Sequence, residues 1–309
     1  MKLKPKIVLA GGAGCLGRLL RDRFVAAGFE VGILSRRAGP ATVVWDGETL
    51  GPWAGELEGA EAVVNLAGRS VDCRNTAANR RRIMDSRLRS TRVLGEAIAR
   101  CECPPRVWLN ASTATIYRHT YGPAWDEAGE IGACAEAKDG FSVEVATAWE
   151  REFEQATAPH TRKVALRAAM VLSREGGVFP VLRRLARLGL GGRMGDGRQF
   201  MSWIHGDDFV RAVEWLIRNE AFSGIVNLAA PGPVPNAEFM AQLRRAVGMP
   251  YGLPATRWML EMGAFLLRTE TELIIKSRRV VPGRLLAERF QFRFPTLPSA
   301  LAELTGTET

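Results

Sequence analysis

Glycines recur at a spacing of three near the N-terminus, between a short apolar run and an amphipathic stretch. Gly11, Gly14 and Gly17 follow Lys6–Ala10, which has the composition of a buried strand, and they precede the helical pattern Leu16–Ala27. Glycines so placed permit a tight turn, let main-chain N–H groups approach a pyrophosphate, and direct a helix N-terminus toward its negative charge. The alternative is a tight turn with only a structural role. The pattern favours a dinucleotide-binding loop made of Gly11, Gly12, Ala13, Gly14, Cys15, Leu16 and Gly17.

The end of the second predicted strand indicates which dinucleotide would bind. Glu30–Ser35 is followed by Arg36 and Arg37, with no acid at the position that usually contacts the ribose 2′-hydroxyl of NAD. An arginine can bind a 2′-phosphate through two hydrogen bonds, and the Ser35 hydroxyl can add another donor. These residues favour NADP(H) over NAD(H), unless both arginines are only solvated turn residues.

The expected cofactor site gains small residues at the ends of two further predicted strands. These positions are Leu66, Ala67 and Gly68 after one strand, and Ala111 and Ser112 after the next. Small side chains there would let a dinucleotide pass over the carboxyl ends of the strands, where open α/β sheets bind their ligands.

Short apolar runs alternate with amphipathic stretches over the first two-thirds of the chain, which predicts an α/β fold with a Rossmann-type, doubly wound parallel sheet. Several runs are continuously apolar, as expected of parallel strands covered on both faces. The predicted strands are Lys6–Ala10, Glu30–Ser35, Thr42–Trp45, Ala62–Ala67, Arg106–Ala111, Val164–Ala168 and Gly224–Leu228. The predicted helices are Leu16–Ala27, Thr76–Arg100, Phe141–Ala156, Phe179–Leu188 and Asp208–Asn219.

The pattern changes after Pro231, where prolines punctuate short helices. We expect residues 1–228 to form the NADP-binding Rossmann domain, and residues 229–309 to form a smaller, mainly helical C-terminal lobe that covers the substrate pocket. Within this lobe, Arg289–Pro295 alternates phenylalanine with polar residues and predicts a brief strand.

Composition narrows the classes of protein to consider. The 309 residues are 47% hydrophobic and 24% charged, and no apolar run reaches the length of a membrane-spanning helix. A start that leads directly into the first strand predicts a cytoplasmic protein. Five cysteines, an odd number, favour free thiols over a disulfide framework, and no cluster of His, Cys, Asp or Glu indicates a metal site.

The net charge of +9 comes mainly from arginines, clustered at residues 80–92 and 183–187. Their helical spacing favours solvated faces, although one or two of these side chains can serve an anionic ligand. Nucleic-acid binding through residues 80–92 is a weaker alternative, because no nucleic-acid motif accompanies them. We therefore expect a small-molecule substrate, no nucleic acid and no membrane as partners, and a monomer or homodimer.

Two further sequence motifs follow the glycine loop, Asn65-Leu66-Ala67-Gly68 and Ser112-Thr113-Ala114-Thr115-Ile116-Tyr117. With them the chain resembles the extended short-chain dehydrogenase/reductases, the NAD-dependent epimerase/dehydratase family, over nearly its whole length. It is most similar to an atypical branch with its own C-terminal domain, the YfcH-like sugar-nucleotide epimerases. The strings that match this branch are Arg82–Arg87, Leu188–Gly192, Gly197–His205 and Arg279–Leu285.

The chain departs from the family at its catalytic pair. The family's chemistry relies on a Ser or Thr, which Thr113 matches, and on a Tyr and a Lys four residues apart on one helix face. Here Phe141 and Val145 stand at those two positions, and a shift of one residue gives Ser142 and Ala146. The Tyr-Lys pair is therefore missing in every register, as it is in the atypical branch.

A second departure concerns the substrate. Sugar-nucleotide enzymes of the family usually place an arginine near the substrate phosphates, where this chain has Met201. Arg198 is close enough in sequence to substitute from a different angle. The resemblance therefore leaves the substrate open.

Four residues are candidate catalytic groups. Thr113 can hydrogen-bond a substrate oxygen beside the nicotinamide, or it can be a strand-end hydroxyl bonded to the backbone. Tyr117 can be an acid, or it can be a packed aromatic whose hydroxyl contacts solvent. Glu144 lies one turn from Phe141, where burial would raise its pKa and make it a usable acid, and its alternative is a solvated carboxylate. His205 can be an acid or base near neutral pH, or it can be structural.

The sequence thus predicts an NADP(H)-dependent oxidoreductase or epimerase-like enzyme of the extended short-chain type, with altered acid/base groups. Its substrate would be a nucleotide-sugar or another carbonyl or hydroxyl compound. The cofactor would supply hydride transfer, and the protein would supply orientation and a proton route. The alternative is a non-catalytic NADP(H)-binding sensor or regulatory protein. The missing pair supports that alternative, and so do relatives of the branch that are described as division-related.

Overall fold

The central sheet has seven parallel strands in the order β10-β6-β5-β4-β1-β2-β3. The computed structural model describes residues 4–256, 258–259, 262 and 272–306. The strands are β1 Lys6–Ala10, β2 Glu30–Ser35, β3 Thr42–Val44, β4 Ala62–Asn65, β5 Val107–Thr113, β6 Arg162–Ala168 and β10 Gly224–Leu228. The predicted doubly wound sheet is confirmed. The strand order reverses between β1 and β4, and such a switch point is where open α/β sheets bind their ligands.

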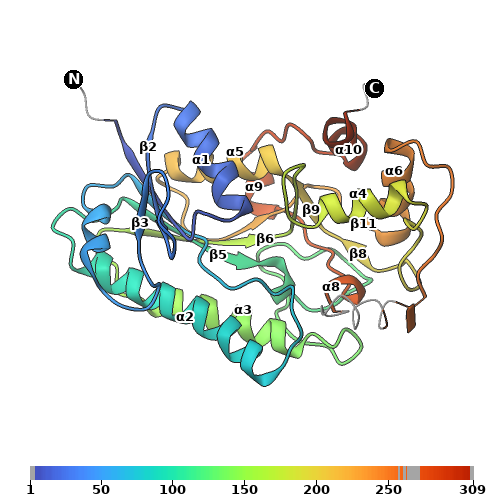
Figure 1. Ribbon diagram of the computed structural model, residues 1–309, viewed down its shortest axis with the longest axis horizontal. Helices are drawn as coiled ribbons and strands as arrows, with labels where there is room; N and C mark the ends of the chain where they lie inside the picture. The colour runs from blue at the N-terminus through green and yellow to red at the C-terminus, as the bar shows by residue number, and fades with distance from the viewer. Residues whose placement is uncertain (1–3, 257, 260–261, 263–271, 307–309) are drawn as a thin grey trace.

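Two pairs of helices cover the sheet, α1 and α5 on one face and α2 and α3 on the other (Figure 1). Their bounds are α1 Cys15–Ala26, α2 Ala77–Ala99, α3 Gly140–Gln155 and α5 Gly206–Arg218. Successive side chains of a strand point to opposite faces, so Ile7 and Leu9 join one core while Val8 and Ala10 join the other. The continuous apolar run of β1 therefore serves both layers.

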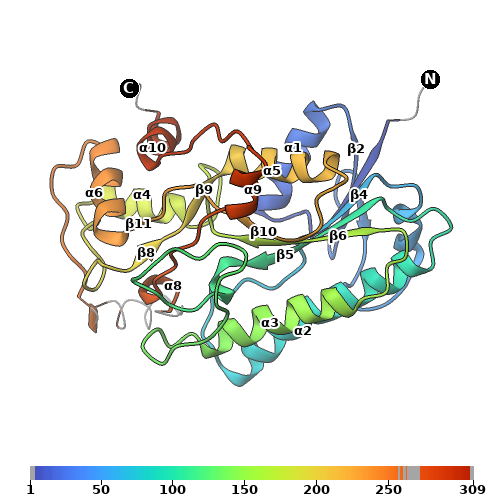
Figure 2. The same cartoon turned by 180° about the vertical axis from the view of Figure 1, so that it is seen from behind.

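A third core lies beside the sheet, where α4, α6 and α10 gather (Figure 2). It combines Leu182 and Trp203 with Phe239 and Leu301, so it draws on chain from both sides of residue 228. The domain boundary expected at that residue stays a prediction. The remaining elements are η1 Pro52–Leu57, η2 Ala114–Ile116, β7 Met170–Leu172, α4 Phe179–Arg187, β8 Phe200–Met201, β9 Trp203–His205, β11 Val234–Pro235, α6 Asn236–Ala246, α8 Glu272–Ile275, α9 Gly283–Ala287 and α10 Leu297–Thr305.

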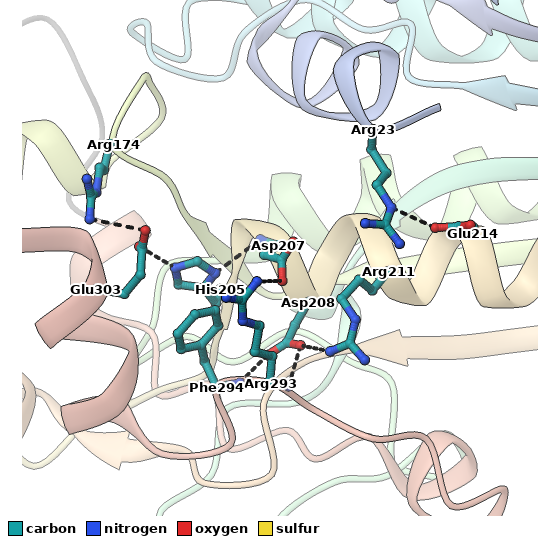
Figure 3. Close-up of polar contacts among 10 residues, drawn as sticks. All are labelled: Arg23, Arg174, His205, Asp207, Asp208, Arg211, Glu214, Arg293, Phe294 and Glu303. Atoms are coloured by element: carbon teal, nitrogen blue, oxygen red, sulfur yellow. Dashed lines mark hydrogen bonds and ion pairs between the residues drawn. The ribbon is translucent and has the colours of Figure 1, made fainter. Parts of the chain in front are cut away.

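The strand predicted at Arg289–Pro295 is wrong, because this segment has no regular secondary structure. The backbone N–H groups of Arg293 and Phe294 donate to the buried Asp208 carboxylate at 2.7 and 2.8 Å instead of pairing with a strand (Figure 3). Phe290 is buried in the core shared with α5. The alternating phenylalanines therefore reflect packing against a helix, which a pattern of period two does not distinguish from a strand.

Candidate functional site

The loop after β1 is shaped by glycines whose replacement would cause collisions. Gly11 has a φ of +73°, and a Cβ there would lie 2.7 Å from the Cα of Ala67. A Cβ on Gly17 would lie 2.1 Å from the carbonyl oxygen of Gly12, which brings α1 tightly against the loop. Helix α1 starts after Gly14, with no side-chain cap and no acid in its first turn. Its first N–H groups are thus left for an anionic ligand.

The first cavity, of about 320 Å³, lies over this loop and the end of β2. Arg36 and Ser35 line it, and the Ser35 Oγ accepts a hydrogen bond from the N–H of Arg37. Arg37 itself is exposed and outside the lining. The full lining is Gly11, Ala13, Gly14, Ser35, Arg36, Trp45, Asp46, Gly47, Glu48, Leu66, Ala67, Gly68, Arg69, Ser86 and Ser90.

Two carboxylates in the first cavity were not expected from the sequence. Asp46 follows the short strand β3, and the Thr49 hydroxyl and two backbone N–H groups hold its pKa below the usual range. Glu48 forms an ion pair with Arg89 at 2.7 Å. The Glu48 charge is therefore paired within the chain, which reduces its repulsion of a phosphate bound near Arg36, whereas the hydrogen bonds to Asp46 favour the charged form of that carboxylate.

The second cavity, of about 520 Å³, continues from the first, because Gly11, Gly14 and Leu66 line both. It runs past the N-terminus of α1 to the end of β5 and to one face of α3. The full lining is Gly11, Gly14, Cys15, Leu16, Gly17, Leu66, Ser70, Val71, Ile83, Arg87, Ala111, Ser112, Thr113, Thr115, Phe141, Ser142, Val145, Ala146 and Trp149. All predicted cofactor residues except Gly12 and Arg37 therefore line one of these two cavities.

Phe141 and Val145, at the positions of the family's Tyr-Lys pair, both line the second cavity. The cavity is apolar where that pair would present a phenol and an ammonium. Ser142 lines it as well, and its hydroxyl donates to Glu272 Oε2 at 2.8 Å. Glu272 lies in α8 and is buried, and burial raises its pKa. A hydroxyl bonded to a carboxyl group therefore lies next to the position of the missing tyrosine.

Thr113 ends β5 and lines both the second cavity and a third one. Its Oγ1 accepts a hydrogen bond from the N–H of Thr115 at 3.1 Å, which starts the short helix η2. A hydroxyl that accepts a bond from a backbone N–H still has its own proton to donate. The structure thus leaves Thr113 able to hydrogen-bond a ligand oxygen.

Tyr117 lies away from the three cavities, buried beneath the sheet edge. Its hydroxyl donates to Asn227 Oδ1 and accepts from Arg167 Nη1, each at 2.8 Å. Burial raises the pKa of this phenol, although the charge of Arg167 opposes the shift. Because Arg167 is also ion-paired with Glu150 at 2.7 Å, Tyr117 belongs to a buried network. These contacts favour the structural alternative for Tyr117.

The burial that a catalytic role of Glu144 would require is absent, since its side chain is exposed and lines none of the three cavities. On α3 the inward face carries Val143, Ala146 and Trp149. Glu144 falls on the other side, because one residue turns an α-helix by about 100°. Its alternative, the solvated helix carboxylate, describes this position.

His205 is buried at the start of α5 and lines none of the three cavities. Its Nδ1 accepts a hydrogen bond from the N–H of Asp207 at 3.1 Å, which caps the helix. Its Nε2 lies 3.0 Å from Glu303 Oε2, and its ring packs against Phe294 (Figure 3). His205 therefore joins α5 to the C-terminal segment, as its structural alternative describes.

Arg87 reaches into the second cavity, although its position in an arginine-rich helix pointed to a solvated face. It donates to the carbonyl oxygens of Ile83 and Arg69 at 3.0 and 3.1 Å, and its guanidinium lies 5.1 Å from the Trp149 ring centroid. Burial lowers the pKa of Arg87 to about 10, so it remains charged at neutral pH. Helical periodicity could have found this arginine, because Arg87 lies four residues after the buried Ile83 and seven before the buried Leu94, on the inward face of α2.

The third cavity, of about 390 Å³, adjoins the second through Val71, Thr113 and Thr115. Charged residues from the segment after α8 reach it: Lys276 Nζ donates to the Thr115 carbonyl oxygen at 2.5 Å, and Arg278 Nε donates to Thr115 Oγ1 at 3.1 Å. The full lining is Val71, Thr113, Ala114, Thr115, Ala168, Ala169, Met170, Val178, Leu182, Met194, Met201, Ser202, Asn236, Ile274, Lys276 and Arg278.

Asp139, Glu272, Lys276 and Arg278 form a charge cluster beside Thr115. Lys276 Nζ and Asp139 Oδ2 lie 2.5 Å apart, and both side chains are fully buried. Burial lowers the pKa of the Lys276 ammonium, while Asp139 and Glu272 oppose that shift. The sequence did not predict this cluster, because Asp139 lies more than 130 residues before the other three members and no motif links them.

The parallel sheet, the glycine loop at its switch point and the connected cavities define a Rossmann-type dinucleotide-binding protein. A sequence model described as the NAD dependent epimerase/dehydratase family matches residues 7–229, and the chain belongs to that family. A second model, described only as a domain of unknown function (DUF1731), matches residues 255–304.

Named relatives cover almost the whole chain. Epimerase family protein SDR39U1 of Bos taurus is 32% identical over 303 residues, covering 97% of this chain and 99% of the relative. Epimerase family protein Mb2239 of Mycobacterium bovis is 34% identical over 307 residues, covering 97% of each chain. The family resemblance seen in the sequence is therefore confirmed.

Two solved structures have the same fold. Human epimerase family protein SDR39U1 (isoform 2), crystallised with NADPH, superposes with a TM-score of 0.88 at 29% identity and covers 98% of this chain and 100% of that one. A nucleoside-diphosphate sugar epimerase from Corynebacterium glutamicum gives a TM-score of 0.79 at 28% identity and covers 99% of this chain and 59% of the other.

The described residues also bear on membrane spans and metal sites. None of their helices combines the length and the hydropathy that crossing a membrane requires. The same residues hold no group of three His, Cys, Asp or Glu side chains placed to bind a metal ion.

Proposed function

We propose that the protein is an NADP(H)-dependent oxidoreductase or epimerase-like enzyme that acts on a small molecule. The observation that carries this proposal is that the glycine loop and Thr113 line one continuous cavity. Membership of the epimerase/dehydratase family and the NADPH in the human SDR39U1 structure support the cofactor. Arg36, at the edge of the first cavity, supports the phosphorylated form.

The residues present fit such a dinucleotide. A Cβ at Gly11 or Gly17 would collide with the chain, and the first N–H groups of α1 have no side-chain cap. We assign the pyrophosphate to this loop, the 2′-phosphate to Arg36 and Ser35, and the nicotinamide end to the second cavity. When bound, the cofactor would supply hydride transfer.

The chain's own task in the reaction would be to orient the substrate and to move a proton. Thr113 would donate a hydrogen bond to the substrate oxygen, because it lines two cavities and its hydroxyl, which already accepts a backbone hydrogen bond, still has a proton to donate. The Ser142 hydroxyl, backed by Glu272, would be a route for a proton where the family's tyrosine is missing. Phe141 and Val145 would exclude water from that end of the cavity.

A second candidate function is a non-catalytic NADP(H) sensor. It is favoured by the apolar side chains of Phe141 and Val145 where the family carries its acid and its lysine. Such a protein would bind the same cofactor through the same loop. It would change its binding of a partner, such as a division-related protein, between NADP+ and NADPH.

The cofactor assignment is tested by Arg36→Gln, with Arg37→Gln as the matched control. Removing one charged hydrogen bond of ~1.5–3 kcal/mol should weaken NADPH binding by roughly 10- to 100-fold. NADH binding should change little in either variant. Calorimetry on both nucleotides measures this, and equal losses for NADPH and NADH in Arg36→Gln would contradict the assignment.

Catalysis is tested separately by mixing the NADPH-loaded protein with a panel of carbonyl compounds in a stopped-flow instrument. Oxidation of NADPH that slows by roughly 10- to 100-fold in Thr113→Ala would support an enzyme, since loss of one hydrogen bond in the transition state costs ~1.5–3 kcal/mol. No oxidation with any compound, together with partner binding that depends on the redox state of the cofactor, would favour the sensor.

A further inference from the structure

The wall of the second cavity carries a charge at Arg87. Of the described residues that line this cavity, Arg87 alone is charged. Val145 stands where the family carries its lysine, so that ammonium is replaced by an apolar side chain. A guanidinium therefore faces the cavity to which we assign the nicotinamide end of a dinucleotide.

The charge of Arg87 is not neutralised by an acid. Across the described ranges no carboxylate forms an ion pair with it, and burial lowers its pKa with no acid opposing the shift. Its contacts are the neutral carbonyl oxygens of Ile83 and Arg69 and the ring of Trp149. A cation held among neutral groups away from solvent is costly unless a counter-ion joins it. These surroundings therefore favour a ligand with negative charge.

The guanidinium keeps one edge for such a ligand. Both hydrogen bonds to carbonyl oxygens are donated by Nη1, which leaves the N–H groups of Nε and Nη2. Two parallel N–H groups of an arginine can bind two oxygens of a phosphate at once. The bonds through Nη1 and the contact with Trp149 also hold the side chain in place, which lowers the entropy lost on binding.

The guanidinium lies near the junction of the first and second cavities. A Cβ on Gly68, which lines the first cavity, would lie 3.2 Å from Arg87 Cζ. Gly11 and Gly14 line both cavities, and a Cβ on Gly11 would meet Ala67, the neighbour of Gly68. The glycine loop thus borders this junction from the layer of α1, and Arg87 borders it from the layer of α2 (Figure 1).

We propose that Arg87 is a second binding element for the diphosphate of the dinucleotide, and that it acts from the α2 side while the glycine loop acts from the α1 side. A helix N-terminus offers only about half an elementary positive charge, so the loop alone leaves most of the diphosphate charge unbalanced. Arg36 would select the 2′-phosphate, whereas Arg87 would hold any nicotinamide dinucleotide. This inference rests on the cofactor placement in the proposed function.

The test titrates NADPH, NADH and adenosine 2′-monophosphate into the full-length native protein and Arg87→Gln in a calorimeter. Arg87→Gln should bind NADPH and NADH roughly 10- to 100-fold more weakly, because both lose a charged hydrogen-bond partner. This differs from Arg36→Gln, which should weaken NADPH alone. Adenosine 2′-monophosphate carries the 2′-phosphate without the diphosphate, so its affinity should stay within about twofold.

The matched control is Arg82→Gln, because Arg82 is exposed on the same helix and lines none of the three cavities. All three affinities should stay native in this variant. If Arg87→Gln does not fold, Arg87→Lys keeps the charge and should bind both dinucleotides within roughly tenfold of the native protein. A larger loss in Arg87→Lys would contradict a role based on charge.

The outcomes separate this inference from the proposed function. Absence of NADPH binding by the native protein would overturn both. Native NADPH binding with unchanged dinucleotide affinities in Arg87→Gln would overturn this inference alone. An equal loss of adenosine 2′-monophosphate affinity would also overturn it, because Arg87 would then only maintain the shape of the site.

Discussion

The two ends of the connected cavities are built in different ways. At the cofactor end, Gly11 and residues 13–17 line the wall, so one short stretch of main chain shapes it. At the end that we assign to the substrate, Lys276 and Arg278 line the third cavity, and Asp139, more than 130 residues earlier in the sequence, pairs with Lys276 behind the wall. Both ends meet at Thr113.

This difference decides what each end tolerates. A wall of main chain offers N–H donors without desolvating a charge, and an added side chain disrupts it by steric overlap. A wall of buried charges fails when one partner is removed, because the other charge then remains buried without compensation. The cofactor end should therefore be sensitive to an added side chain, and the substrate end to a removed charge. Three variants make that contrast measurable.

The largest effect should come from Lys276→Met at the substrate end. It leaves the fully buried Asp139 carboxylate without its ammonium, and breaking a buried pair costs ~3–5 kcal/mol. Urea denaturation measures the free energy of unfolding. The double variant Asp139→Asn/Lys276→Met removes both charges and should recover most of the loss. If the single variant stays within ~1 kcal/mol of the native protein, Lys276 is not compensating a buried charge.

The next effect should come from Gly17→Ala at the cofactor end. The added Cβ would lie 2.1 Å from the Gly12 carbonyl oxygen, so α1 or the loop must shift. Overpacking of this kind costs ~1–3 kcal/mol, and the shift should also weaken NADPH binding. Gly140→Ala is the matched control, because a Cβ there meets nothing within 4 Å. It should leave both stability and NADPH affinity near native values. Equal stability and equal NADPH affinity of the two variants would contradict the proposed sensitivity of the cofactor end to an added side chain.

The same difference explains how much the sequence could predict. The sheet, α1 and the glycine loop follow from local patterns, because a buried parallel strand and a βα turn depend on neighbouring residues. Thr113 was predictable from the family resemblance and from its place at the end of a predicted strand. Lys276 and Arg278 were not, because their roles depend on which distant elements pack together. The choice between a buried and a solvated Glu144 stayed open for a related reason, since a helix pattern with mixed residues does not fix which side faces the cavity.

The smallest effect should come from Glu272→Gln, and it should appear only as a change with pH. Burial raises the pKa of Glu272 in the folded protein above its unfolded value near 4.5. The folded state then binds a proton that the unfolded state releases, so this group's contribution to stability is complete at low pH. It is lost as the pH rises from about 4.5 through the raised pKa.

The difference in free energy of unfolding between the native and Glu272→Gln proteins should therefore change as the pH rises. The glutamine cannot ionise, yet its amide oxygen can still accept the Ser142 hydrogen bond. Relative to the native protein, the variant should gain on the order of 1 kcal/mol in free energy of unfolding between pH 4.5 and 7.5. Urea denaturation at a series of pH values gives this difference while the other titrating groups cancel. A difference independent of pH would mean that the pKa of Glu272 is the same in the folded and the unfolded protein, and would contradict the shift.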